Sequence, residues 1–268
     1  MKNIKLHVCM TGHHLEGNYT NIKSLLDRLR DLKSHVALEC HIIFKNNEIP
    51  YYSDRVLPDN IKEKLRKDGH ENVNFVSYES EFIKYGGTHV PRSRSPSSLT
   101  IQHEPLREFI ILQSVPDNEF IFKTRTDIHV DDHFIELFLD PNFYDSLKTK
   151  ESPNTVFEYK IWNSLIGPSN VFEFTDYFFL GRVKEIKKTL IKNHAESERL
   201  CRHPIASSDH VVFTEKLQYI KPLLPLIEER NIRNVNSDFY WDIIKSNFEV
   251  TYIAEGNDPR RPVLDRNR

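Results

Sequence analysis

The chain has 268 residues, of which 38% are hydrophobic and 28% charged, and its mean hydropathy is −0.54. This composition predicts a soluble protein with a sizeable α/β core and a polar surface. The net charge of −2 and the pI of about 6.7 exclude the bulk basicity of nucleic-acid binders, so no nucleic-acid partner is expected.

The first half of the chain alternates strand and helix patterns. These are, in order, a strand over 4–11, a helix over 22–32 capped by Thr20 or Asn21, an apolar strand over 36–44, a polar helix over 59–68 stopped by Gly69, a strand over 73–78, a loop over 86–97, a helix over 99–115 started or kinked by Pro105, and a strand over 119–124. Strands that alternate with helices indicate a mostly parallel sheet wrapped by helices.

The second half is less regular and richer in helices. We expect a helix over 132–139, a strand over 175–180, several further helices and a late strand over 250–253. Without an internal repeat or a long linker, the simplest organisation is one domain over 1–255 followed by a polar tail over 256–268. No signal peptide and no long apolar run is visible, so cytoplasmic residence is the default expectation.

Several familiar site motifs are absent. The eight glycines do not form GxGxxG, and the chain contains neither HExxH, GxSxG nor a CxxC pair. Gly12 and Gly17 have the spacing of a phosphate-binding loop, but Asn18 and Tyr19 stand where Lys and Ser or Thr are needed.

One segment, FIFKTRTDIHVDD over 120–132, combines an apolar strand with a charged end. Strand alternation places Lys123, Arg125 and Asp127 on one side. Ligands of an open parallel sheet bind beyond the carboxyl ends of its strands, where two cations can hold a phosphate and the carboxylate a divalent metal. Alternatively, Arg125 and Asp127 simply pair with each other at the strand end.

The acids and histidines that follow have two interpretations. His129 and His133, with the acids between them, are compatible with a metal site. A solvated helix start explains them better, with Asp131 or Asp132 as its N-cap.

At this segment the chain resembles a known family. KTRTD, preceded by EFIF, is similar to the KxRxD signature of WavE-type lipopolysaccharide-synthesis glycosyltransferases and related bacterial polysaccharide enzymes. Three more matches follow in order: Asp176 in TDYFFLGR, Asp209 in Ser208-Asp209-His210 at the start of an apolar helix, and the late strand IIKSNFEV over 243–250. The resemblance covers about 99–250, and the first hundred residues agree only in their general βαβ layout.

This resemblance implies a GT-A-like, Rossmann-type fold with a nucleotide-sugar-binding half over 1–130 and an acceptor half over 131–255. It implies a metal-dependent glycosyltransferase that uses Mn²⁺ or Mg²⁺, a nucleotide-sugar donor and a surface-polysaccharide, lipopolysaccharide or other glycolipid acceptor. Asp127 is assigned to the metal, and Arg125 and Lys123 to the phosphates or to holding Asp127. Thr11 and Gly12 are assigned to the nucleotide, although the family's usual opening motif is absent there. Arg107 is a candidate for a second phosphate contact, although a surface helix arginine is the simpler explanation.

The base of an inverting transfer must reach the acceptor hydroxyl. Asp209 is the first candidate and Asp176 the second. An N-cap role explains Asp209 equally well, and Asp176 is alternatively an acceptor for a sugar hydroxyl. A retaining reaction needs neither residue as a base. The sequence leaves the stereochemistry and the oligomeric state open.

Two other functions compete with glycosyl transfer. The same acids suit a nucleotidyl- or phospho-transferase, which releases pyrophosphate or a nucleoside monophosphate. A non-catalytic carbohydrate-binding protein would use aromatics such as Trp162, Tyr177 and Trp241, for which core packing is the more frequent role. Peripheral membrane contact would rest on the arginines of the 256–268 tail, which Asp258 and Asp265 offset.

Overall fold

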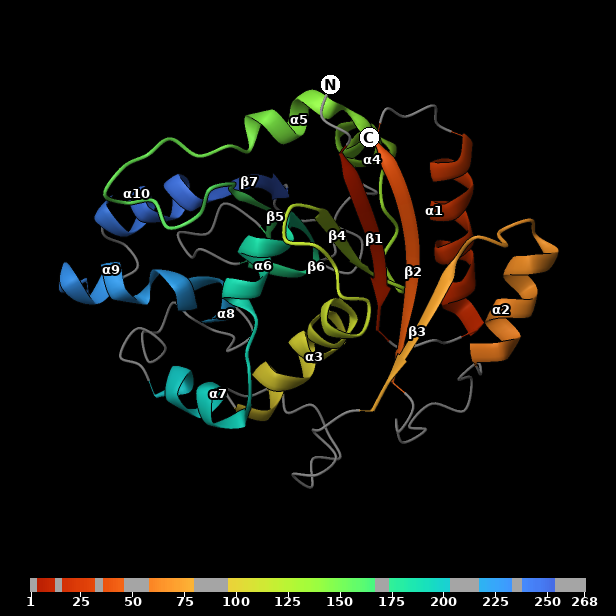
Figure 1. Cartoon of the computed structure of the whole chain (residues 1–268), viewed down its shortest axis with the longest axis horizontal. Helices are drawn as coiled ribbons and strands as arrows, with labels where there is room; N and C mark the ends of the chain where they lie inside the picture. The colour runs from red at the N-terminus through yellow and green to blue at the C-terminus, as the bar shows by residue number, and fades with distance from the viewer. Residues whose placement is uncertain are drawn as a thin grey trace.

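The chain folds around one central sheet covered by helices (Figure 1). The computed structural model describes residues 4–12, 16–31, 36–45, 58–79, 96–166, 174–202, 217–232 and 238–253.

In the described part of the chain, the sheet has seven strands in the order β3-β2-β1-β4-β6-β5-β7. Their bounds are β1 Lys5–Thr11, β2 Ala37–Lys45, β3 Asn74–Tyr78, β4 Phe120–Arg125, β5 Ile161–Ile166, β6 Phe174–Arg182 and β7 Phe248–Ile253. β6 runs antiparallel to both of its neighbours, β4 and β5, and the other strand pairs are parallel. This architecture confirms the expected fold class, an α/β protein with a mostly parallel sheet flanked by helices.

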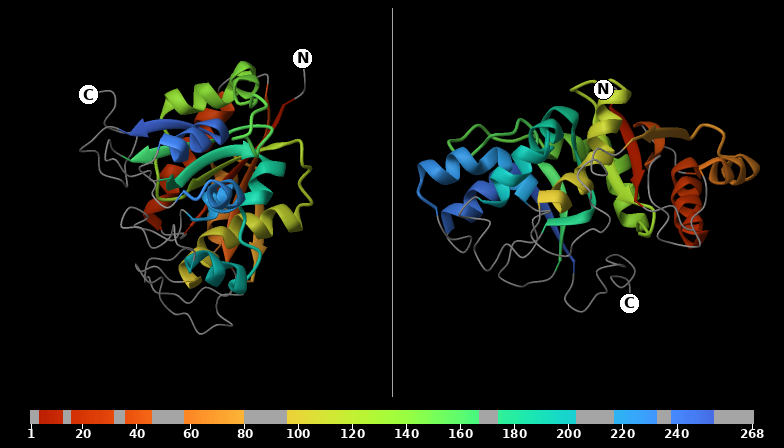
Figure 2. Two further views of the ribbon diagram at one scale, coloured as in Figure 1. Left: turned by 90° about the vertical axis from the view of Figure 1, so that its left-hand side faces the viewer. Right: turned by 90° about the horizontal axis from the view of Figure 1, so that it is seen from below.

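Helices cover both faces of the sheet (Figures 1 and 2). The helices are α1 Tyr19–Asp31, α2 Pro58–Lys67, α3 Pro96–Leu112, α4 Asp132–Leu139, α5 Pro141–Ser146, α6 Val183–Thr189, α7 His194–Cys201, α8 Leu217–Ile220, α9 Leu224–Glu229 and α10 Asp238–Asn247, with 3₁₀ turns η1 Glu16–Asn18 and η5 Lys221–Leu223. Within the described residues, α6 to α10 all follow β6, so the C-terminal half is helix-rich as expected.

Strand alternation divides the core into two layers. Cys9 and Ile121 face the layer formed with α3, α6 and the C-terminal helices. Val8 and Phe122 face the opposite layer, which α1, α2, α4 and α5 complete. Because β1 and β4 bury side chains on both faces, their sequences read as nearly unbroken apolar runs.

Most predicted elements are confirmed, with three corrections. α1 begins at Tyr19, so Thr20 and Asn21 lie inside its first turn and neither is the N-cap. β5, IWNSLI, was not predicted, because its polar centre interrupts the apolar pattern and its pairing with β6 and β7 is a tertiary property. β7 begins at Phe248, two residues before the late strand expected over 250–253, and the first five residues of the 243–250 segment belong to α10 instead of a strand.

The remaining expectations concern segments that the structure does not describe or does not test. The predicted loop lies outside the described residues except for its last two positions, which begin α3, and the 256–268 tail lies outside them entirely. Strands from both predicted halves join one sheet, but the division into donor and acceptor halves stays a prediction. Within the described part of the chain, no helix combines the length and the apolar character needed to cross a bilayer.

The junction between α10 and β7 depends on one buried amide. Asn247 is fully buried, and its Oδ1 accepts hydrogen bonds from the backbone N–H groups of Val156 and Phe157 at 2.7 and 3.2 Å. Its Nδ2 donates to the carbonyls of Asn154 and Ile243 at 2.7 and 2.8 Å. The side chain therefore ties the segment before β5 to the last turn of α10. Figure 1 shows α10 leading into β7 beside β5.

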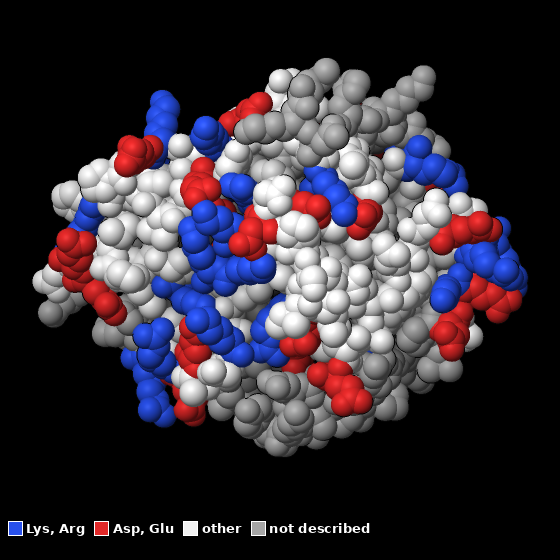
Figure 3. All heavy atoms as spheres, in the orientation of Figure 1, with Lys and Arg blue, Asp and Glu red and all other residues white. Residues whose placement is uncertain are grey.

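Charges of both signs meet on the surface over α6 (Figure 3). Each lysine of this helix pairs with a carboxylate, Lys184 with Glu158, Lys187 with Asp117 and Lys188 with Glu185. Neighbouring carboxylates therefore neutralise the lysines of α6, in keeping with the near-zero net charge of the chain.

The substitution Asn247→Ala is expected to lower the free energy of unfolding by about 3 kcal/mol or more, because it removes a hydrogen-bond partner from four buried or half-buried backbone groups. Urea denaturation followed by circular dichroism measures the change. The exposed Asn142 is the matched control, and its alanine variant is expected to lose less than about 1 kcal/mol. Equal losses in the two variants would contradict this role of Asn247.

Candidate functional site

The candidate site lies where β1 and β4 end. The two strands pair in parallel register, with Thr11 opposite Arg125 at their carboxyl ends. The pairing continues one residue further, because the backbone N–H of Thr126 donates to the carbonyl of Thr11 at 2.9 Å. The side chain of Thr11 also donates to the carbonyl of Thr124 at 3.3 Å. The structure therefore brings the predicted nucleotide-contacting loop beside KTRTD.

Gly12 allows the end of β1 to pass close to Thr126, which follows β4. Its φ of +116° lies in a region that L side chains rarely adopt. A Cβ atom at this position would lie 3.4 Å from Oγ1 of Thr126. A glycine is thus required where β1 turns away past the end of β4.

Thr126, which the sequence analysis did not single out, joins this turn to the start of α1. The residue is buried, and Nδ2 of Asn18 donates to its Oγ1 at 3.4 Å. Nδ2 of Asn21 donates to its carbonyl, also at 3.4 Å. The sequence signal for this role was the second threonine of KTRTD. A hydroxyl that is buried in a turn needs hydrogen-bond partners, so this residue was a candidate for linking the turn to another segment.

Arg125 and Asp127 form a two-point ion pair just beyond β4. Nε of Arg125 donates to Oδ1 of Asp127 at 2.9 Å, and Nη2 donates to Oδ2 at 2.7 Å. The two side chains remain 31% and 38% exposed, so solvent reaches the pair. A carboxylate oxygen has a second lone pair beyond the one that Arg125 uses, so Asp127 can still bind a cation.

The carboxyl group of Asp127 is held in its ionised form. Burial raises its pKa, but the hydrogen bonds and charge of Arg125 outweigh burial and keep the pKa below its usual value. The positive charge of Lys123 lowers the pKa further, and this lysine is itself buried, with 7% exposure. The site thus combines two cations with one charged carboxylate. The pairing of Arg125 with Asp127, given above as the alternative to a ligand site, is present, and the binding of a phosphate or a metal here stays a prediction.

The two predicted base candidates, Asp176 and Asp209, differ in whether the structure describes them. The register of β4 with β6 runs from Phe120↔Arg182 to Lys123↔Phe179, so the backbone of Asp176, near the start of β6, lies at the edge where β4 ends. Asp209 lies outside the described residues.

Arg107 lies in a different environment from the edge of the sheet. Its Nη1 donates to the carbonyls of Ile191 and Lys192 at 3.5 and 3.1 Å, and its Nε donates to Glu108 at 2.9 Å. These contacts join α3 to the segment between α6 and α7, and a phosphate contact for Arg107 stays a prediction.

The acids after Asp127 start a helix, as expected. Asp131 is the N-cap of α4, and its side chain accepts from the backbone N–H of His133 at 2.9 Å. Asp132 pairs with Arg28 of α1 at 2.8 Å. Burial and the charge of Arg28 lower the pKa of His129 despite the two acids. These contacts anchor α4 against α1.

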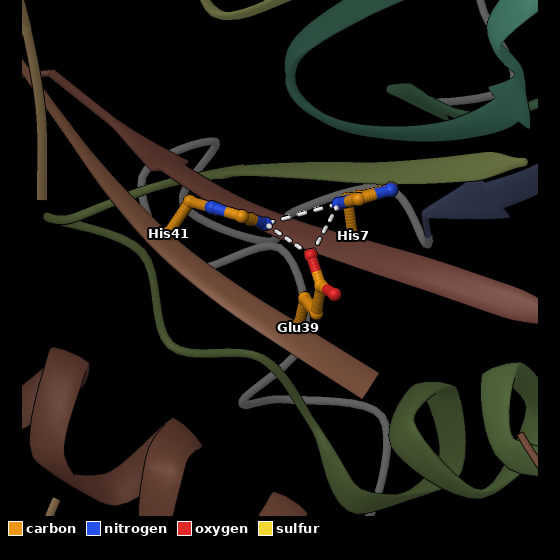
Figure 4. A group of neighbouring side chains, drawn as sticks. All are labelled: His7, Glu39 and His41. Atoms are coloured by element: carbon orange, nitrogen blue, oxygen red, sulfur yellow. Dashed lines mark hydrogen bonds and ion pairs between the residues drawn. The ribbon is translucent and has the colours of Figure 1, made fainter. Parts of the chain in front are cut away.

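A group of side chains that could hold a metal ion lies elsewhere in the sheet (Figure 4). Among the described residues, one group of at least three histidine, cysteine or acidic side chains has its ligand atoms within 4.8 Å of one another, namely His7, Glu39 and His41. The sequence analysis missed this group. The available signal was a polar residue inside the apolar run of β1 and an ExH pair inside the run of β2, since residues two apart share a strand face.

Replacing Gly12→Ala is expected to destabilise the fold by about 1–3 kcal/mol, because alanine is strained at this φ. Thermal or urea unfolding measures the loss. Gly17 is the matched control, since nothing lies within 4 Å of its Cβ position, and Gly17→Ala is expected to be neutral or slightly stabilising. A neutral Gly12→Ala variant would show that the turn does not need glycine.

Replacing Arg125→Gln is expected to raise the pKa of Asp127, because burial then acts without the opposing cation. The depressed pKa of the wild type means that the pair stabilises the fold above the ordinary aspartate value of about 4 and loses this effect as the pH falls through the folded value. The chemical shift of the Asp127 carboxyl carbon, followed by NMR as a function of pH, gives the pKa in the wild type and in the Arg125→Gln variant. An unchanged pKa would remove Arg125 as the cause.

Comparisons with known proteins leave the family open. No family model matches the chain, and no curated protein matches it. Among solved structures, the crystal structure of 4-diphosphocytidyl-2C-methyl-D-erythritol synthase aligns with a TM-score of 0.38 and 6% identity, over 74% of this chain and 86% of that chain. A likeness of this strength assigns no activity, so the function must be argued from the site.

Proposed function

We propose that the protein is a metal-assisted glycosyltransferase, similar to the WavE type, which transfers a sugar from a nucleotide-sugar donor to a surface-polysaccharide or lipopolysaccharide acceptor. The observation that carries the proposal is the solvent-accessible Arg125–Asp127 pair beyond β4, beside the Gly12 turn of β1. An open α/β sheet binds nucleotides at this edge.

The chemistry follows from the charge that develops on the leaving nucleoside diphosphate. Lys123 and Arg125 hold positive charge at the edge where the diphosphate would bind, and such fixed charges stabilise a transition state without reorganising. Asp127 is ionised, partly exposed and has lone pairs beyond those that Arg125 uses, which fits a single-carboxylate site for Mg²⁺ or Mn²⁺. The metal, when bound, would neutralise further charge on the leaving group.

The acceptor hydroxyl needs a base if the reaction inverts the sugar configuration. Asp209 is the first candidate for this role. Asp176 is the second, supported by the position of its backbone at the same sheet edge, and it alternatively binds a sugar hydroxyl. The nucleotide-sugar donor, the glycan or glycolipid acceptor, cytoplasmic residence and peripheral membrane contact belong to the same proposal.

Replacing Asp127→Asn is expected to lower the kcat/KM for Mn²⁺-dependent turnover of the nucleotide sugar by about 10²–10³-fold. The assay uses the full chain and separates the nucleotide products by chromatography. Circular dichroism is expected to be unchanged, because the residue lies on a partly exposed turn.

The matched control is Asp145→Asn on α5. The neighbouring Tyr144 packs against Phe120 at the first residue of β4, so this helix lies at the opposite end of the strand from Asp127. The control variant is expected to retain full activity. Full activity of Asp127→Asn would contradict the metal assignment, and release of pyrophosphate or a nucleoside monophosphate would favour the nucleotidyl- or phospho-transferase function instead.

A further inference from the structure

Three side chains from β1 and β2 converge on one point beneath α3 (Figure 4). Nδ1 of His7 lies 3.0 Å from Nε2 of His41, and Oε2 of Glu39 lies 3.5 Å from the first nitrogen and 3.8 Å from the second. Parallel pairing produces this convergence, because His7 is in register with Glu39 and Cys9 with His41. The ring of Phe109 covers the two imidazoles, with centroids 5.9 and 4.6 Å away.

These separations match those of ligand atoms around a tetrahedral metal. Zn²⁺ binds imidazole nitrogen and carboxylate oxygen at about 2.0–2.2 Å, which places two tetrahedral ligand atoms about 3.3–3.5 Å apart. The three observed distances, 3.0, 3.5 and 3.8 Å, lie on both sides of this value. Small side-chain rotations would bring the three ligand atoms to bonding distance from one ion.

The outer contacts orient His7 as a ligand. Its second nitrogen, Nε2, lies 2.5 Å from Oε2 of Glu119. A carboxylate only accepts hydrogen bonds, so Nε2 carries the proton and the lone pair of the neutral ring lies on Nδ1, toward the cluster. Ligating histidines in metal sites are held by carboxylates in the same way.

His41 points its Nε2 atom toward the cluster. Because the lone pair of His7 lies on Nδ1, Nε2 of His41 donates the 3.0 Å hydrogen bond between the two rings. Nδ1 of His41 is buried and has no hydrogen-bond partner among the described residues. Metal binding through Nε2 would therefore replace the hydrogen bond to His7 and move the proton of His41 to Nδ1, where the ring has no hydrogen bond to lose.

The charges of the surrounding groups favour one divalent cation. Glu39 and Glu119 are the acidic groups, and Lys5 lies 2.8 Å from Oε1 of Glu39 and 3.6 Å from Glu119. Lys5 thus offsets one carboxylate, and it contacts the oxygen of Glu39 that does not face the imidazoles. The side chain of Glu39 is 42% exposed, so solvent can reach this side of the cluster.

We propose that His7, His41 and Oε2 of Glu39 bind one Zn²⁺-class divalent ion, with water as the fourth ligand and Glu119 orienting His7. Two imidazoles and a carboxylate select zinc and similar borderline metals over Mg²⁺ or Mn²⁺. The ion would link β1 to β2, which are neighbouring strands from the N-terminal part of the chain. This proposal does not depend on the proposed glycosyl transfer, whose cation is held by Asp127.

The test titrates chelator-stripped full-length protein with Co²⁺ and follows the visible absorption of the tetrahedral ion. We expect one equivalent to bind and to be displaced by Zn²⁺. Glu39→Gln is expected to weaken Co²⁺ binding at least about tenfold and Glu119→Gln by about 10–100-fold. The partly exposed Glu39 is the safer variant for folding, which circular dichroism checks.

Two controls separate this site from other histidines and from the proposed active site. His70→Gln changes another buried histidine that is paired with a carboxylate, Asp27, at 2.9 Å, and it is expected to keep wild-type Co²⁺ binding. Asp127→Asn is expected to do the same while losing glycosyl transfer. Absence of tetrahedral Co²⁺ absorption in the wild type would overturn the proposal, as would unchanged affinity in both Glu39→Gln and Glu119→Gln.

Discussion

The parallel pairing of β1 with β4 is the constraint on which the candidate site depends. It sets Thr11 opposite Arg125 and extends through the hydrogen bond from Thr126 to Thr11. Both strands bury apolar side chains on their two faces, so a shift of register by one residue would exchange side chains between the two core layers and disrupt the packing of both. The packing of the interior therefore fixes which polar residues meet at the carboxyl edge.

The ion pair between Arg125 and Asp127 has a structural and a chemical consequence. The two hydrogen bonds fix the carboxylate of Asp127, and the guanidinium charge keeps it ionised despite partial burial. An exposed ion pair of this kind contributes little to stability. Its larger effect is electrostatic, because it provides a charged carboxylate beside two cations at a solvent-accessible position.

The sheet carries two candidate cation sites with different donor atoms. Asp127 offers oxygen beyond the end of β4, whereas His7, His41 and Glu39 offer two nitrogens and one oxygen within β1 and β2. His7 precedes Thr11 by four residues, which corresponds to about 13 Å along a strand. Hard ions such as Mg²⁺ favour the first donor type and borderline ions such as Zn²⁺ the second, so the two sites are chemically distinct.

The periodicity of the sequence determined most of the strands and helices, the mostly parallel sheet and the charged end of β4, because each follows from local side-chain patterns. The polar residues in the centre of β5 interrupt its apolar pattern, so the sequence did not predict this strand. The start of α1 depends on the 3₁₀ turn that precedes it and not on Thr20 or Asn21. Only the tertiary structure decided that Arg125 pairs with Asp127, that Arg107 holds the segment after α6, and that His7 meets His41. Those contacts depend on strand order and register, which are set by long-range burial of the whole core and not by neighbours in the chain.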